Sequence, residues 1–391
     1  MLSLAREMHR HLDFHLLLEM SPEAWSSALF DVSPQPLPSG ITDGDAALKD
    51  CVPASIRACW QQAKTFDLVV HDFPKALHPR TWRTSLRAAR FIRALRPDVL
   101  HLDNYSLRLA PLLWLLRGIP TVLTLHDPEP HSGEGDWRIE LARRLTFPHV
   151  DRFLLLNESG KPGFARRFGV EASRIDSALL GSHGLCKEWM QGAPAEEERT
   201  VLFFGRLSPY KGLPVFYAAA EIVARRLGAV RFIVAGRPRP DYTPPPPPTL
   251  ANGARVEVLD RYIHNRETAE LFSRATAVAC PYVDATQSGV VLTAFAFGKA
   301  VVASRIGGLP EYVEDGITGL LVEPGDANGL ADALVRLLED GELRRRMRAA
   351  IGLRVHSQLS WAATAEGLVQ CYRRAIGESA RSEAAGAITP S

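Results

Sequence analysis

Short apolar runs alternate with amphipathic segments along almost the whole chain. In the first part, such runs predict buried strands at Phe14–Leu18, Asp67–Val70, Asp98–Leu102, Thr121–Leu125 and Arg152–Leu156. Helical patterns lie between them at Thr81–Leu95, Leu107–Leu116 and Arg138–Leu145. Apolar strands separated by helices are typical of parallel sheets that carry helices on both faces. We therefore expect an α/β fold.

The alternation restarts after the acidic, small-residue segment Gln191–Arg199, which predicts two doubly wound units. Strands of the second unit are expected at Val201–Phe204, Arg231–Ala235, Arg255–Leu259, Ala277–Cys280, Ala300–Ala303 and Gly319–Val322. A length of 391 residues is compatible with this division. Residues 1–195 would form the first domain and residues 196–356 the second. Helices within residues 357–380 are expected to return to the first domain, and residues 381–391 to form a flexible tail.

Composition excludes several classes of protein. The apolar fraction of 46% and the charged fraction of 23% are those of a globular chain, and a net charge of +2 gives no sign of a nucleic-acid partner. The five cysteines form no Cys-x-x-Cys pair, which favours a reducing compartment over a disulfide framework. No apolar run is long enough to span a bilayer, and the N-terminal residues lack a secretory signal pattern. The expected location is the cytoplasm, with peripheral contact at the inner face of the membrane as an alternative.

The first strand of the second unit leads into a glycine-bounded loop that runs from Gly205 to Gly212 and is followed by a helix. Ligands of doubly wound sheets bind beyond the carboxyl ends of the strands. A helix that begins there offers free N–H groups and a positive dipole end to an anion. Arg206 and Lys211 of this loop are therefore candidates for a diphosphate clamp. The alternative is a surface loop with two solvated cations.

A second junction of this kind follows the predicted strand Ala277–Cys280. Its loop reaches Ser288 and Gly289, where the next helix begins. Backbone N–H groups at that position could bind phosphate or sugar oxygens. Ser288 could also serve as a helix cap without any ligand. The residues alone leave both interpretations open.

Several motifs in the second unit together resemble a known family. They are Gly205-Arg206 with Lys211-Gly212, Gly298-Lys299-Ala-Val-Val-Ala-Ser304, Gly307-Gly308-Leu-Pro-Glu311 and Asp315-Gly316 through Gly325. This set resembles the retaining family 4 glycosyltransferases of the GT-B fold, densely over residues 200–326 and more thinly before them. The resemblance implies two Rossmann-like domains that face each other across a cleft. It also implies transfer of a sugar from a nucleotide-diphosphate-sugar donor.

The resemblance further implies which residues form the site. His126, Arg206 and Lys211 would be catalytic, with His126 facing the donor sugar from the end of the strand Thr121–Leu125. The expected donor-binding residues are Gly205, Arg206, Lys211, Tyr262, Ile263, Asp284, Gln287, Ser288, Gly289, Val290 and Thr293. No metal or other cofactor is expected, because the nucleotide sugar is a co-substrate. Two interpretations compete for His126: it could merely close its strand against loop carbonyls, or bind a metal with His131, although further ligands of suitable spacing are lacking.

The sequence departs from the family pattern in two places. The family has two glutamates eight positions apart around the second loop, where this chain has Ala285 and Thr293. Asp284 could replace the first glutamate, and Thr293 could bind a ribose hydroxyl more weakly than a carboxylate would. The alternative function is therefore a catalytically impaired nucleotide-sugar-binding or scaffold protein. Second, Met1–Arg10 already resembles the family's first helix, so we expect a truncated gene model that lacks the first strand and its glycine-rich loop.

A basic segment in the first domain bears on the acceptor. Arginines recur at helical spacing within residues 80–96, where no acidic residue occurs. Such a helix can have a solvated arginine face, or it can rest on an anionic membrane surface. Several relatives act on lipid-linked acceptors, so the resemblance implies a saccharide or lipid-linked acceptor and a role in cell-surface polysaccharide or glycolipid synthesis. No nucleic-acid partner is expected, because the basic face lacks interleaved aromatic residues.

Overall fold

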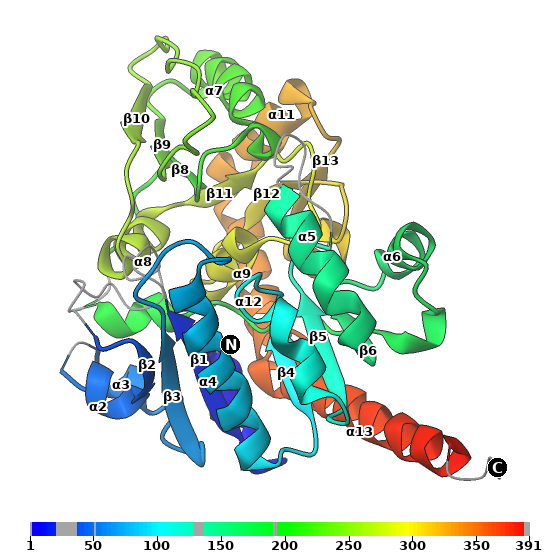
Figure 1. Cartoon of the computed structure of the whole chain (residues 1–391). Helices are drawn as coiled ribbons and strands as arrows, with labels where there is room; N and C mark the ends of the chain where they lie inside the picture. Colours follow the sequence, from blue (N-terminus) through cyan, green and yellow to red (C-terminus); the bar gives the residue numbers. More distant parts are fainter. Residues whose placement is uncertain are drawn as a thin grey trace.

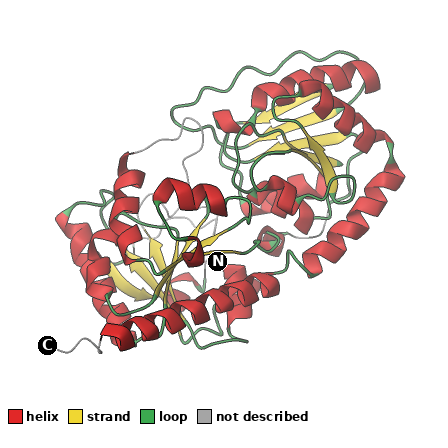
Figure 2. Cartoon of the chain, turned by 90° about the vertical axis from the view of Figure 1, so that its right-hand side faces the viewer, coloured by secondary structure: helices red, strands yellow, loops and turns green. Residues whose placement is uncertain are grey.

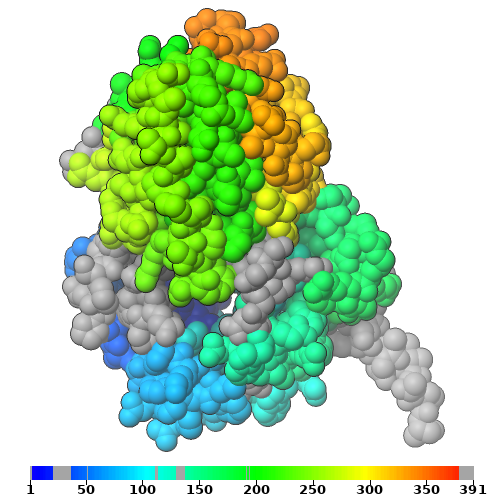
Figure 3. Space-filling model, turned by 90° about the horizontal axis from the view of Figure 1, so that it is seen from above, coloured from blue at the N-terminus to red at the C-terminus, as the bar shows by residue number. Residues whose placement is uncertain are grey.

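The computed structural model describes residues 2–20, 37–50, 52–128, 137–190, 192 and 194–386, without the side chains of residues 111, 112 and 378–386. These residues form two α/β halves, each with its strands covered by helices (Figures 1 and 2). The space-filling view shows the halves as two adjoining lobes, one coloured green to orange and the other blue to cyan (Figure 3). The segments 21–36 and 129–136 lie outside the described residues.

The C-terminal half, residues 194–356, contains a parallel six-stranded sheet. Its strands are β8 (Thr200–Phe204), β9 (Arg231–Ala235), β10 (Arg255–Leu259), β11 (Ala277–Cys280), β12 (Val301–Ser304) and β13 (Gly319–Val322). They lie in the order β10-β9-β8-β11-β12-β13. The order therefore reverses between β8 and β11, and such a switch point opens a crevice at the carboxyl ends of the strands. The two candidate phosphate-binding loops leave these two neighbouring strands.

Helices cover both faces of this sheet. They are η5 (Pro209–Lys211), α7 (Leu213–Leu227), α8 (Asn265–Arg274), α9 (Gly289–Ala296), α10 (Leu309–Tyr312), α11 (Ala327–Glu339) and α12 (Gly341–His356). Successive side chains of a strand point to opposite faces, so Leu202 and Phe203 enter different cores. Phe203 packs in the cluster that holds Phe216 of α7, and Leu202 in the cluster that holds Phe272 of α8. Burial on both faces explains why the inner strands β8, β9, β11 and β12 are mostly apolar.

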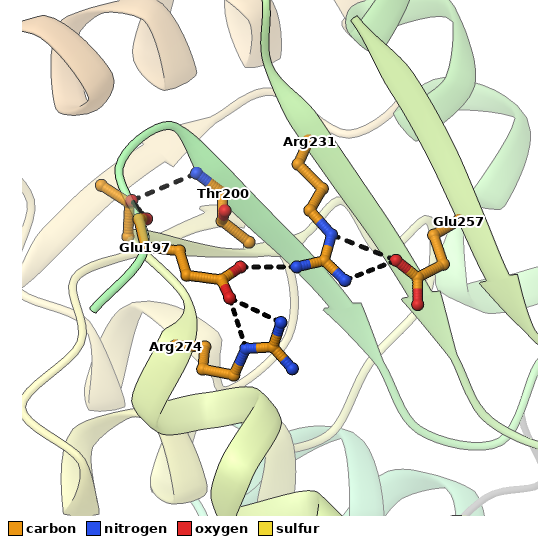
Figure 4. A network of polar contacts seen from close by, with 6 residues as sticks. Glu197, Thr200, Arg231, Glu257 and Arg274 are labelled. Carbon is orange, nitrogen blue, oxygen red and sulfur yellow. Dashed lines mark hydrogen bonds and ion pairs between the residues drawn. The ribbon is translucent and has the colours of Figure 1, made fainter. Parts of the chain in front are cut away.

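A polar network fastens the start of this half to its sheet (Figure 4). The Glu197 carboxylate binds Arg231 of β9 at 2.5 Å and Arg274 of α8 at 2.5 Å. Arg231 also pairs with Glu257 of β10, and the Thr276 hydroxyl donates to the Glu197 carbonyl oxygen at 2.6 Å. The segment before β8 is thus held to the start of β9, to the end of α8 and to Thr276 before β11.

The N-terminal half contains two separate sheets. The first joins β1 (His15–Met20), β3 (Thr65–Val70) and β2 (Gly40–Asp43) in that order, and the second joins β4 (Leu100–Asp103), β5 (Thr121–Leu125), β6 (Arg152–Leu155) and β7 (Ile175–Ser177). Leu17 of β1 and Leu100 of β4 pack against one hydrophobic cluster, although no described strand pairs with both β1 and β4. The two edge strands are only partly buried, which corrects the expectation of fully buried strands there.

Helices and turns surround these sheets. They are α1 (Leu2–Met8), α2 (Gly44–Leu48), α3 (Ala54–Arg57), α4 (Pro79–Leu95), η1 (Ala110–Leu116), α5 (Trp137–Thr146), η2 (Phe147–His149), α6 (Lys161–Phe168), η3 (Ala172–Arg174) and η4 (Leu185–Trp189). The long helix α13 (Trp361–Gly386) crosses from the C-terminal half and runs along this one (Figure 1). Its Leu368 packs in one cluster with Val122 of β5 and Leu154 of β6. The predicted tail begins inside α13, and residues 387–391 lie outside the described residues.

The structure differs from the expected elements in three further places. The segment predicted as a helix at Leu107–Leu116 is the 3-10 helix η1, which contains Pro111, a residue without a backbone N–H. Strand β2 was not predicted and pairs with β3 in antiparallel direction, so the first sheet is mixed. Strand β7 was also not predicted, because three residues are too short for a periodic signal.

Candidate functional site

A cavity of about 280 Å³ lies between the two halves, next to the carboxyl ends of β8 and β11. Asp127 and His183 of the N-terminal half line it from one side. The C-terminal half contributes Phe204, Tyr210, Lys211, Tyr282, Gln287, Ser288, Gly289, Val290 and Thr293. The cavity therefore lies at the switch point of the sheet, where the sequence predicts the donor site.

Lys211 is held in the first loop with its ammonium group at the cavity. Only 6% of the residue is exposed, and its Nζ lies 3.1 Å from the Tyr282 hydroxyl. Two glycines shape this loop. A Cβ on Gly205 would lie 2.8 Å from the Lys211 Nζ, and a Cβ on Gly212 would lie 1.9 Å from the Pro281 carbonyl oxygen. Both glycines have positive φ, so the loop can pack tightly against the start of the second loop. Arg206 is exposed and does not line the cavity.

The second loop places two hydroxyl groups beside Lys211. The buried Tyr282 hydroxyl lies 3.2 Å from the Ser288 Oγ, which in turn accepts a hydrogen bond from the backbone N–H of Val291 at 3.3 Å. Ser288 thus caps α9 and also lines the cavity, so the two interpretations of its role are compatible. Burial raises the pKa of Tyr282 well above its usual value, so its hydroxyl stays protonated and can donate.

The family's two glutamate positions have no carboxylate here. The Thr293 side chain lines the cavity and donates to the Gly289 carbonyl oxygen at 2.8 Å. Ala285 is buried, and a Cβ on Gly307 would lie 1.6 Å from its carbonyl oxygen. Asp284, the expected substitute, does not line the cavity.

His126 is paired with an acid that sequence reasoning missed. It follows β5, and its Nε2 lies 2.7 Å from the Oδ1 of Asp103 at the end of the neighbouring strand β4. Burial alone would lower the pKa of His126, but the hydrogen bond and charge of Asp103 outweigh it and raise the pKa above its usual value. An acid at the end of an adjacent strand was the available signal, since parallel strand ends meet at one sheet edge.

Thr286 connects the second loop to the opposite half. Its hydroxyl group contacts the His126 carbonyl oxygen at 3.3 Å and donates to the Oδ1 of Asp127. Its own carbonyl oxygen accepts from the Asn157 Nδ2 at 2.9 Å. Thus Thr286 holds the loop of the C-terminal half against the strand ends of the N-terminal half.

A second bridge between the halves uses the last residue of the Gly-Gly-Leu-Pro-Glu motif. The Glu311 carboxylate accepts from the backbone N–H groups of Glu158 at 2.7 Å and Ser159 at 2.8 Å. The neighbouring Tyr312 hydroxyl donates to the Leu156 carbonyl oxygen at 2.6 Å. Glu311 and Tyr312 therefore join the halves rather than line the cavity.

The sequence of this chain matches known protein families in both halves. Residues 198–340 match the family described as glycosyl transferases group 1, and residues 51–177 match glycosyltransferase family 4. The chain belongs to the family 4 glycosyltransferases. Among curated relatives, the D-inositol 3-phosphate glycosyltransferases of Mycobacterium tuberculosis (strain ATCC 25618 / H37Rv) and Mycobacterium bovis (strain ATCC BAA-935 / AF2122/97) are each 38% identical over 194 residues. That match covers 48% of this chain and 39% of either relative, so the chain spans well under half the length of these relatives.

Several solved structures share the fold of this chain. The Anabaena protein HepE in complex with UDP-glucose matches with a TM-score of 0.62 and 18% identity over 94% of this chain and 99% of that one. A glycosyltransferase from Rickettsia africae ESF-5 matches with a TM-score of 0.60 and 12% identity, over 94% of this chain and 99% of that one. Sucrose-phosphate synthase from Thermosynechococcus elongatus matches with a TM-score of 0.58 and 20% identity, over 80% of this chain and 84% of that one. The predicted GT-B fold is confirmed.

Within this family 4 glycosyltransferase, the structure brings only some of the expected site residues to the cavity. Lys211, Gln287, Ser288, Gly289, Val290 and Thr293 line it. Tyr262 and Ile263 follow β10, two strands away from β8, and do not line it. His183, on the acceptor side, lines the cavity and stacks on Trp361 with 8° between the rings. Burial lowers the pKa of His183 to about 4, so it is a neutral ring at pH 7.

The described residues also bear on metal binding, membrane insertion and the state of the cysteines. Over the part of the chain that the structure describes, no three His, Cys, Asp or Glu side chains lie close enough to hold a metal ion, and His131 is outside that part. No described helix combines the length and the apolar character that a membrane span requires. The four described cysteines, Cys59, Cys186, Cys280 and Cys371, are buried free thiols.

Proposed function

We propose that this protein transfers a sugar from a nucleotide-diphosphate-sugar donor to an acceptor hydroxyl with retention of anomeric configuration. The buried Lys211 ammonium group, at the cavity next to the carboxyl ends of β8 and β11, carries this proposal. A buried cation at a switch point favours an anionic ligand such as a diphosphate. Family membership supports the reaction class, and HepE is a relative in fold whose complex contains UDP-glucose.

Lys211 would act on the leaving group. Negative charge grows on the diphosphate as the bond to the sugar breaks, so a fixed ammonium stabilises the transition state more than the ground state. Arg206 is exposed and does not line the cavity, and we propose that it turns toward the diphosphate when the donor binds.

On the acceptor side, His126 would hydrogen-bond the donor sugar or the substrate in the transition state. Its Nε2 is engaged by Asp103, so Nδ1 is the atom available for this bond. For retention we propose a same-face displacement, in which the departing diphosphate oxygen takes the proton of the incoming acceptor hydroxyl. The donor is the only co-substrate, and the proposed route needs no metal.

The acceptor is proposed to be a saccharide or a lipid-linked saccharide, used in the cytoplasm at the inner face of the membrane. The arginines of the segment 80–96 are all exposed, namely Arg80, Arg83, Arg87, Arg90, Arg93 and Arg96. Trp82 of α4 is 41% exposed, and Trp114 of η1, which packs on α4, is 54% exposed. Arginine beside exposed tryptophan suits a membrane interface. Co-sedimentation of the full chain with phosphatidylglycerol vesicles, but not with phosphatidylcholine vesicles, is expected, and loss of Arg83, Arg87 and Arg90 should abolish it.

The enzyme proposal is tested by binding and turnover together. The purified chain is titrated with UDP, GDP and ADP and then incubated with the matching glucose or mannose donors and acceptor extracts. We expect one nucleotide diphosphate to bind, and an α-linked product from an α-linked donor by NMR of the anomeric proton. Failure to bind any of the three contradicts the proposal.

The second candidate function is nucleotide-sugar binding without catalysis, favoured by the absence of carboxylates at Ala285 and Thr293. Donor binding without turnover for any acceptor extract would favour this candidate over the enzyme.

A further inference from the structure

The cavity contains a carboxylate that no sequence motif predicts. Of the described residues that line it, Asp127 is the only acid and Lys211 the only lysine or arginine. They approach from opposite halves, Lys211 from the loop after β8 and Asp127 from the loop after β5. A nucleotide sugar has the same polarity, because its diphosphate needs a cation and its sugar offers hydroxyl donors.

The position of Asp127 is fixed by the opposite half. The Thr286 hydroxyl donates to its Oδ1, and Thr286 itself is held by the Asn157 amide at 2.9 Å. An ionised carboxylate has about four acceptor sites, so one carboxylate can accept from a loop hydroxyl and from sugar hydroxyls at the same time. The second loop presents no carboxylate to the cavity, since Asp284 is outside the lining.

The neighbouring Gln287 adds an independent observation. This residue lines the cavity, and its Oε1 is buried without a hydrogen-bond partner. Buried polar atoms are rarely left unsatisfied in folded proteins, so this oxygen indicates a missing hydrogen-bond donor at the cavity wall. Sugar hydroxyls are donors of the required kind.

We propose that Asp127 is the specificity-determining residue for the donor sugar and accepts hydrogen bonds from its hydroxyl groups. This inference rests on the proposed function, because it takes the diphosphate to be bound at Lys211. A site built to bind a hydroxyl strongly rejects an analogue that lacks it, since its charged acceptor is then left unsatisfied. Because Thr286 fixes Asp127 across the two halves, sugar recognition requires both halves in place.

The test compares nucleotide and nucleotide-sugar affinity in the full chain. Calorimetry with UDP and UDP-glucose, GDP and GDP-mannose, and ADP and ADP-glucose first identifies the pair that binds. In D127N, which keeps the size of the side chain, we expect the affinity for the nucleotide sugar to fall about 10-fold or more while the affinity for the nucleotide changes less than about twofold. D332N removes an exposed carboxylate outside the cavity lining and is the matched control, expected to leave both affinities unchanged.

Further measurements separate recognition of the sugar by Asp127 from the contact between the halves that Asp127 makes with Thr286. T286V removes the bond to Asp127 but keeps the carboxylate, so its effect on nucleotide-sugar affinity should be smaller than that of D127N. The wild type should bind a deoxy analogue of the nucleotide sugar more weakly than the parent compound. D127N should bind the analogue and the parent with nearly equal affinity. Equal weakening of nucleotide and nucleotide sugar in D127N would overturn the inference, as would lost turnover at unchanged affinity. If the wild type binds no nucleotide diphosphate, the proposed function itself fails.

Discussion

His126 and Asp103 form a hydrogen-bonded pair at the ends of the adjacent strands β5 and β4, with 2.7 Å between Nε2 and Oδ1. About a third of each side chain is exposed, so the pair borders solvent, and neither residue lines the cavity. Behind it, the His101 Nε2 lies 2.8 Å from the Thr124 Oγ1, and the Tyr372 hydroxyl of α13 lies 2.8 Å from the His101 Nδ1. Burial lowers the pKa of His101 to about 4, so this inner ring is neutral.

Substitution D103N should lower the pKa of His126 to below its usual value of about 6.5, because burial remains while the hydrogen bond and negative charge are lost. NMR titration of the ring protons in wild type and variant measures this. D13N, which alters an exposed acid, should leave the pKa of His126 unchanged. An unchanged value in D103N would show that the pair does not control this histidine.

The same pair makes stability depend on pH. The folded-state pKa of His126 is raised, so its contribution is complete below the ordinary histidine pKa and is lost as the pH rises through the folded value. D103N should therefore cost more unfolding free energy at pH 6 than at pH 9. Urea unfolding at the two pH values checks the sign, and an equal or reversed cost would contradict it.

K211M should weaken nucleotide diphosphate binding about 10-fold to 100-fold, since hydrogen bonds to charged groups contribute about 1.5–3 kcal/mol. K299M is the matched control, because Lys299 is also buried but binds Glu196 at 2.6 Å and does not line the cavity. We expect K299M to lower the melting temperature and to leave nucleotide affinity unchanged. Equal loss of affinity in both variants would place the effect in folding rather than in binding.

D176N should destabilise the fold by about 3 kcal/mol, because it leaves the Arg152 guanidinium buried without its carboxylate. Asp176 also binds Arg374 of α13 at 2.6 Å, so the variant should loosen that helix. D332N, which breaks the exposed pair with Arg226, is expected to cost less than about 1 kcal/mol. Urea unfolding of both variants and of the wild type measures the two losses of unfolding free energy.

The pKa of Asp176 also predicts acid sensitivity. Burial would raise this pKa, but the bonds and charges of Arg152 and Arg374 outweigh it and lower it. The group therefore stabilises the fold above the ordinary aspartate pKa, and the stabilisation is lost as the pH falls through the lowered value. Wild type should lose its advantage over D176N on acidification, and an advantage that persists at pH 2 would contradict this.

G212A should destabilise the protein by about 2 kcal/mol or more, because φ is +72° at Gly212 and the new Cβ would meet the Pro281 carbonyl oxygen. Displacement of the loop should also weaken nucleotide binding through Lys211. G163A places a methyl group in open space on α6 and should be neutral or slightly stabilising. Thermal unfolding and nucleotide titration of both variants test this.

The sequence predicts most elements and the phosphate loop because their signals are local. All six strands of the C-terminal half occur within a residue of their predicted ranges. Burial on both faces makes the inner strands β8, β9, β11 and β12 mostly apolar. Gly205, Lys211 and Gly212 lie within eight residues of one strand-loop-helix junction, where chain geometry alone directs N–H groups at a ligand. The short strands β2 and β7 lack such signals and were missed.

Only the tertiary structure shows which carboxylate lines the cavity and which one pairs with His126. Asp103 meets His126 because β4 and β5 pair in parallel, and Asp127 meets Thr286 across 159 residues because the two halves pack together. Strand register and the packing of two domains depend on contacts far apart in sequence, which a local pattern of apolar and polar residues does not encode. From its residues alone, this chain is predicted to be a GT-B protein with a phosphate-binding loop, whereas the acid that lines the cavity is seen only in the fold.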